Sequence, residues 1–158
     1  MNKISEVIKI KSGMASFVNL CEEFFDEDKS KDRIQSYKPI KSHREVFWEI
    51  SKSMDPINDR CFFLSGSYGT GKSHLCLMLS YYFFQQASAP ELQEFFKTYE
   101  FEDPAQAKVL MNKRLNGRYL VVLPDYSQKG DFESIVLKAL DKTLKQEDFD
   151  KELDFSKA

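Results

Sequence analysis

Apolar residues in this chain follow two patterns, and each pattern predicts a different element. Three- and four-residue spacing, typical of amphipathic helices, predicts three helices, and local signals predict three more. They span about 15–25, 42–54, 72–86, 90–99, 103–116 and 132–146. Continuous apolar runs at 60–65 (RCFFLS) and 118–123 (RYLVVL) predict strands covered on both faces. Strands alternating with helices predict an α/β fold with a parallel sheet and flanking helices.

Local signals set the expected helix ends. Ser42 and Glu45 have the spacing of a capping box. Pro90 and Pro104 suit first helical positions, where a missing N–H costs nothing. Asp131 is an N-cap residue for the helix that reaches residue 146.

Three stretches are less regular. Residues 4–10 predict a short strand or an extended arm. The charged run 26–32 (DEDKSKD) fits an acidic metal or partner patch or a solvated loop, and the loop is favoured. The charged tail, 147–158, is expected to fray.

The segment 66–73 (GSYGTGKS) matches the Walker A spacing G-x-x-x-x-G-K-[ST] and lies between a predicted strand and a predicted helix. Gly66, Gly69 and Gly71 allow positive φ and a close approach to a ligand. Backbone amides of such a loop converge on phosphate oxygens, and the N-terminus of the following helix adds its positive dipole end. The expected nucleotide-binding residues are Gly66, Ser67, Tyr68, Gly69, Thr70, Gly71, Lys72, Ser73 and His74.

Individual roles follow from side-chain chemistry. Lys72 is the expected catalytic residue, with its ammonium between the β- and γ-phosphates of ATP. Ser73 is the expected Mg²⁺ ligand, since this ion keeps most of its waters. His74 has two open interpretations: a contact with the phosphates or a neighbouring backbone, or an ordinary packed or surface side chain. His43, on the preceding predicted helix, receives no role.

Asp125 follows the second apolar run and resembles a Walker B aspartate. A Walker B carboxylate orders the Mg²⁺ shell, and a following Glu would position water. Here Pro124 intervenes and Tyr126 follows. An ordinary loop residue is therefore the favoured interpretation, and hydrolysis by this chain alone stays an open question.

Composition narrows the function classes. The chain has 158 residues, 42% of them hydrophobic, which suffices for one packed core. The net charge is −2, so the composition does not show the excess of basic residues that is typical of DNA-binding proteins. Three cysteines without paired spacing predict reduced thiols and a cytoplasmic protein. The most apolar stretch, 75–84, is too short for a membrane span.

Residues 62–79 (FFLSGSYGTGKSHLCLML) go beyond a generic Walker A loop. The form with Tyr68 and His74 resembles the loop of the BrxC/PglY proteins, large AAA-like P-loop ATPases of bacterial anti-phage (BREX and phage-growth-limitation) systems. The resemblance implies ATP and Mg²⁺ as cofactors and the other subunits of a defence complex as partners.

The expected organisation follows. Residues 1–36 form an N-terminal arm and helix, 37–146 a P-loop NTPase core segment with a helical insertion at 88–117, and 147–158 the tail. Two predicted strands, or three with 4–10, are few for a doubly wound sheet. We therefore expect the N-terminal segment of a larger P-loop ATPase.

Two alternatives from other classes stay open. A small P-loop kinase would need several lid arginines, for which Arg114 and Arg118 are the candidates after the loop. A non-hydrolysing interaction module would use an exposed sheet edge to dock partners or to form a homo-oligomer, because unpaired edges attract further strands.

Overall fold

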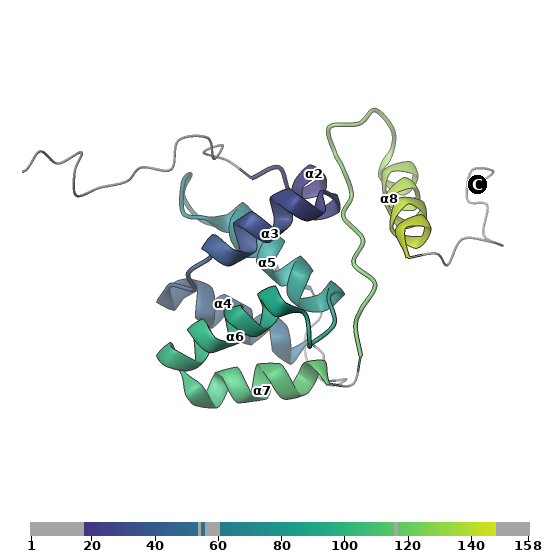
Figure 1. The fold of residues 1–158 in the computed structure, drawn as a ribbon. Coiled ribbons are helices and arrows are strands. Elements are labelled where there is room, and N and C mark those ends of the chain that lie inside the picture. The colour runs from purple at the N-terminus through teal and green to yellow at the C-terminus, as the bar shows by residue number, and fades with distance from the viewer. Residues whose placement is uncertain (1–17, 54, 56–60, 116, 148–158) are drawn as a thin grey trace, which may run out of the picture.

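The structure is a computed structural model that describes residues 18–53, 55, 61–115 and 117–147 (Figure 1). Every regular element within these ranges is a helix. The helices are α2 (Leu20–Phe25), α3 (Glu27–Ser36), α4 (Lys41–Lys52), α5 (Lys72–Phe84), α6 (Pro90–Glu102), α7 (Pro104–Arg114) and α8 (Phe132–Gln146).

The predicted α/β fold with a parallel sheet is wrong for the described residues. Both apolar runs, 61–65 and 118–123, lie outside any helix and carry no strand. Residues 61–65 make no backbone hydrogen bond to another described residue, and in 118–123 such a bond runs from Tyr119 N–H to the carbonyl of Phe83, in a helix. A strand becomes part of a sheet only through a neighbouring strand, and neither run has one here.

α5 is the centre of the helical body. Its buried residues lie all around the helix: Leu75, Leu77, Met78, Leu79, Ser80, Tyr81, Tyr82 and Phe84. A helix that is apolar on every side must be covered on every side. The main core joins it to buried side chains of α3, α4, α6 and α7, such as Ile34, Phe47, Phe96 and Leu110.

Aromatic rings fill much of this core. Phe47 contacts Tyr82 edge to face at a centroid distance of 4.9 Å and packs against Phe95 at 5.3 Å. Such arrangements stabilise a core beyond the area that they bury. Tyr99 joins the cluster, and its hydroxyl donates to Gln106 at 2.9 Å.

Residues 117–125 run between the helical body and α8 (Figure 1). On one side Val121 and Leu123 pack against the second apolar cluster, Phe24, Leu77 and Phe84. On the other side the Thr143 hydroxyl of α8 donates to the Val121 carbonyl at 3.1 Å. The extended run thus links α8 to the rest of the described chain.

Several predicted helix ends are confirmed. α5 begins at Lys72, α6 at Pro90 and α7 at Pro104. α8 spans the predicted range, and Asp131 accepts from the N–H of Ser134 at 2.8 Å. α6 and α7 begin at a proline and α8 follows an aspartate cap, signals that act within one turn of chain, whereas α5 follows Gly71 without a side-chain cap.

Two local predictions are wrong. The run 26–32 is mostly helix α3, because Asp26 caps the helix by accepting from Lys29 N–H at 3.1 Å and Ile34 is buried in the core. The capping box at Ser42 is also absent: α4 begins one residue earlier, with Ile40 as N-cap and no side-chain cap bond. The predictions for residues 4–10 and for the tail beyond 147 lie outside the described residues.

Candidate functional site

The glycine-rich loop, residues 66–71, leads directly into α5. Gly71 is the N-cap residue at φ 79°, and Gly69 has φ 78°. Residues with a Cβ rarely adopt this left-handed region, so both turns require glycine. The loop-to-helix half of the predicted arrangement is confirmed, and the strand leading into the loop is not found among the described residues.

The loop is open to solvent. Residues 66–70 are exposed, and the Tyr68 side chain at the loop apex is 96% exposed. Ser73, in the first turn of α5, is exposed as well. The N–H groups of this first turn have no partner within the helix and carry the positive end of the helix dipole. The site therefore offers backbone donors and a hydroxyl on one open face.

Lys72 folds back over the loop. Its ammonium donates to the carbonyls of Gly66 at 2.8 Å and Ser67 at 2.6 Å and to the Thr70 hydroxyl at 3.4 Å. The Thr70 hydroxyl in turn donates to the Ser67 carbonyl at 2.9 Å. The Lys72 ammonium and the Thr70 hydroxyl therefore lie together against the carbonyls of the loop.

A side chain without a predicted role supports the loop from outside. His43 of α4 places Nε2 3.0 Å from the Thr70 carbonyl and Nδ1 3.1 Å from the Tyr37 hydroxyl. The Tyr37 and His43 rings are nearly parallel, with an interplanar angle of 8°. No sequence signal links His43 to a loop 27 residues away, so only the packing of α4 against the loop identifies it.

His74 turns away from the loop. Its Nε2 atom lies 2.7 Å from the Arg33 carbonyl of α3, and its ring contacts Tyr37 edge to face. Burial lowers the pKa of His74, which keeps the ring neutral at pH 7. The printed contacts of His74 are thus those of a packed side chain that reaches a neighbouring backbone. A contact with nucleotide stays a prediction.

Asp125 has partners within its own turn. Its carboxylate accepts from the N–H and hydroxyl of Ser127, at 3.0 and 2.6 Å, and from the Gln128 amide at 3.2 Å. The hydrogen bonds from Ser127 lower the pKa of Asp125. These contacts are those of a loop-closing aspartate, the interpretation that the sequence favours.

The predicted Mg²⁺ ligand, Ser73, has an exposed side chain. No group of three or more His, Cys, Asp or Glu residues able to hold a metal occurs in the part of the chain that the structure describes. Mg²⁺ accompanying a nucleotide takes its ligands chiefly from water and phosphate, so a single exposed hydroxyl fits that ion.

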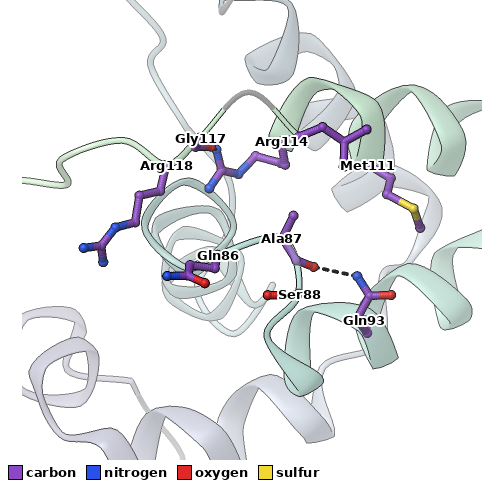
Figure 2. A pocket seen from close by; sticks show the side chains of 9 residues that line it. Gln86, Ala87, Ser88, Gln93, Met111, Arg114, Gly117 and Arg118 are labelled. Carbon is purple, nitrogen blue, oxygen red and sulfur yellow. Dashed lines mark hydrogen bonds between the residues drawn. The ribbon is translucent and has the colours of Figure 1, made fainter.

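Arg114 and Arg118, the arginines that a kinase lid would need, lie at a cavity of about 510 Å³ instead (Figure 2). Arg114 is 1% exposed and donates to the carbonyls of Tyr82, Gln85 and Gly117. Arg118 forms an ion pair with Glu147. Arg114 satisfies carbonyls at the C-terminus of α5, a structural role, because those groups have no partner within the helix.

Cys21, Cys61 and Cys76 are free thiols. None of the described helices has the length and apolar character needed to cross a bilayer.

Comparison of the chain with known protein families, with curated proteins and with solved structures found no match.

Proposed function

We propose that the chain binds a magnesium–nucleoside triphosphate, with ATP as the expected nucleotide, through residues 66–73 at the start of α5. The observation that carries the proposal is the Walker A loop held open to solvent, with Gly69 and Gly71 at positive φ and the Lys72 ammonium folded over it. The proposal concerns this loop and its helix and does not depend on a parallel sheet.

Each group has a definite part in binding. The N–H groups at the start of α5 would donate hydrogen bonds to phosphate oxygens, which would replace water at the positive end of the helix dipole. Lys72 would exchange the carbonyls of Gly66 and Ser67 for β- and γ-phosphate oxygens, because an ammonium gains more from an anion than from a neutral carbonyl. Ser73 would supply its hydroxyl to Mg²⁺.

The proposed setting is a cytoplasmic ATPase of bacterial anti-phage defence, acting with the other subunits of a defence complex. The resemblance of residues 62–79 to the BrxC/PglY loop supports this setting, and the three free thiols suit a reducing compartment. Hydrolysis is outside the proposal, because Asp125 is bound within its own turn.

The test is calorimetric titration of Mg-ATP into the folded chain and its Lys72→Ala variant. We expect saturable binding to the wild type and roughly 10- to 100-fold weaker binding to Lys72→Ala, which loses a charge-assisted hydrogen bond. Lys97→Ala is the matched control, since Lys97 is an exposed lysine on α6 whose side chain is 72% accessible. Its affinity should equal that of the wild type.

Two further measurements sharpen the result. Ser73→Ala should lose most of the Mg²⁺ dependence while keeping the affinity measured in EDTA. A folded wild-type sample that binds neither ATP nor ADP, or a Lys72→Ala variant that binds as well as the wild type, would refute the proposal.

A second function, a docking module that self-associates, is favoured by a separate observation. Phe63 is 94% exposed on the extended run 61–65, and Tyr119 and Leu120 of the other run are each 45% exposed. Unpaired extended backbone with apolar side chains attracts another strand. Light scattering should show concentration-dependent dimers that Phe63→Ser weakens, and a strict monomer at high concentration would exclude this function.

A further inference from the structure

His43 connects two helices to the nucleotide-binding loop. Its ring lies between the Tyr37 hydroxyl, at 3.1 Å from Nδ1, and the Thr70 carbonyl, at 3.0 Å from Nε2. Tyr37 is the C-cap residue of α3, and His43 belongs to the first turn of α4. The loop is therefore attached to the helical body by a side chain from outside its own segment.

The two contacts of His43 indicate its tautomer. The Thr70 carbonyl can only accept, so the contact at Nε2 places the imidazole hydrogen on that atom, which donates to Thr70. Within the described part of the chain, His43 Nδ1 is the hydrogen-bond partner of the Tyr37 hydroxyl. Tyr37 is 5% exposed, and burial raises the pKa of its hydroxyl, which keeps its proton and donates it to Nδ1 of the neutral ring.

That hydrogen bond fixes a peptide plane. The peptide between Thr70 and Gly71 is trans and planar, so its N–H points opposite to its carbonyl. With the carbonyl held toward His43, the Gly71 N–H is directed away from His43. The His43 ring also packs directly on Gly71: a Cβ built there would lie 3.0 Å from Cε1 of the ring.

We propose that His43, as its Nε2–H tautomer, is a positioning residue that holds the Thr70–Gly71 peptide with the Gly71 amide facing the phosphate chain of a bound nucleoside triphosphate. This inference rests on the proposed function. Its physical basis is preorganisation: a loop that is already ordered loses less conformational entropy when it binds. Tyr37 acts one step further out, by donating to Nδ1 and so favouring the Nε2–H tautomer.

Two substitutions of His43 by neutral amide side chains distinguish this role from simple packing. In His43→Gln the side-chain nitrogen reaches the position of Nε2 and can still donate to Thr70. In His43→Asn the amide ends near the position of Nδ1, so it can keep the Tyr37 contact but cannot reach the loop. Tyr37→Phe removes the hydroxyl that donates to Nδ1.

Three readouts are measured on the whole chain. The ¹⁵N shifts of the His43 ring report the tautomer. Relaxation order parameters of the Gly69 and Gly71 amides report loop order without nucleotide. Titration with Mg-ATP reports affinity.

We expect the Nε2–H tautomer in the wild type and a mixture in Tyr37→Phe. Gly71 order parameters should be about 0.85 in the wild type and in His43→Gln and fall below about 0.6 in His43→Asn. Mg-ATP should bind His43→Asn roughly tenfold more weakly than His43→Gln, the loss of about one hydrogen bond.

The outcomes separate the two proposals. Equal loop order and equal affinity in His43→Asn and His43→Gln would overturn the role of His43 and leave nucleotide binding intact. An Nδ1–H tautomer in the wild type would overturn it as well. Failure of the folded wild type to bind Mg-ATP would overturn the proposed function and the phosphate-facing role with it.

Discussion

Two Phe-Phe pairs in this chain have opposite environments. Phe95 and Phe96 of α6 are 4% and 0% exposed, whereas Phe62 and Phe63 of the extended run before the loop are 44% and 94% exposed. The residue types are the same, so their hydrophobicity does not explain the difference. What differs is the backbone on which each pair stands.

A helix forms its backbone hydrogen bonds within one segment, so α6 needs only one apolar surface to cover it. A buried run outside a helix needs partners elsewhere for its N–H and C=O groups, and residues 61–65 have no backbone partner among the described residues. Burial of Phe62 and Phe63 would then bury unpaired backbone, which costs more than the rings would gain. Apolar side chains therefore bury a segment only when the hydrogen bonds of its backbone can also be satisfied.

Truncation of one phenylalanine from each pair gives the largest expected effect. Phe96→Ala should lower the free energy of unfolding by about 3–5 kcal/mol, because it leaves a cavity in a packed core. Phe63→Ala should change it by less than about 0.5 kcal/mol. Urea denaturation followed by circular dichroism measures both. A loss above about 1 kcal/mol in Phe63→Ala would mean that residues 61–65 are packed in solution, and the contrast would fail.

Arg114 tests the junction between the helical body and the second extended run. Arg114→Met should cost about 3 kcal/mol, since the carbonyls of Tyr82, Gln85 and Gly117 lose a charged donor while buried. Arg114→Lys should recover only part, because an ammonium lacks the planar fork of a guanidinium. Equal stability of Arg114→Met and the wild type in urea would show that this junction is not held by the arginine.

Asp131 tests a helix that depends on local signals. Asp131→Ala should destabilise α8 by about 1 kcal/mol, because the N–H of Ser134 loses its cap. Hydrogen exchange of the α8 amides is the measurement. Asp141→Ala, which removes an i,i+4 pair with Lys145 on the same helix, is the control and should cost no more than about 0.5 kcal/mol. Equal exchange rates in the two variants would deny the cap its role.

His74 gives the smallest effect, a pH dependence. Burial lowers the folded-state pKa of His74 below its ordinary value of 6.5. As the pH falls below 6.5 the unfolded state takes up the proton first, so stability present at neutral pH declines toward the lowered pKa. His74→Gln should therefore lose less thermal stability than the wild type between pH 7 and 5.5. Parallel curves would show that His74 is not protonated differently in the two states.

Local sequence signals predicted much of the helical structure. Pro90, Pro104 and Asp131 mark helix starts that the structure confirms, because a proline or a cap acts within one turn. Asp26 caps α3 in the same way. Because the surrounding run is dense in charged residues, the sequence favoured a loop there, and the helix was missed. The opposite error occurs at Ser42. Its spacing to Glu45 predicted a capping box, but no side-chain cap forms there.

The candidate site divides in the same way. The positive-φ turns at Gly69 and Gly71 and the helix start at Lys72 follow from the loop sequence itself. The support from His43 could not be predicted, because it depends on how α4 packs beside a loop 27 residues away. The direction of His74, toward α3, was open for the same reason.

The sequence alone determined where most of the helices begin and where the backbone turns through glycine, since both depend on neighbours a few residues apart. Tertiary structure alone decided that the two apolar runs have no strand partner among the described residues, that α5 is the buried centre there and that His43 reaches the loop. Those outcomes depend on which segments distant in sequence contact one another. Packing and hydrogen bonding between segments determine those contacts.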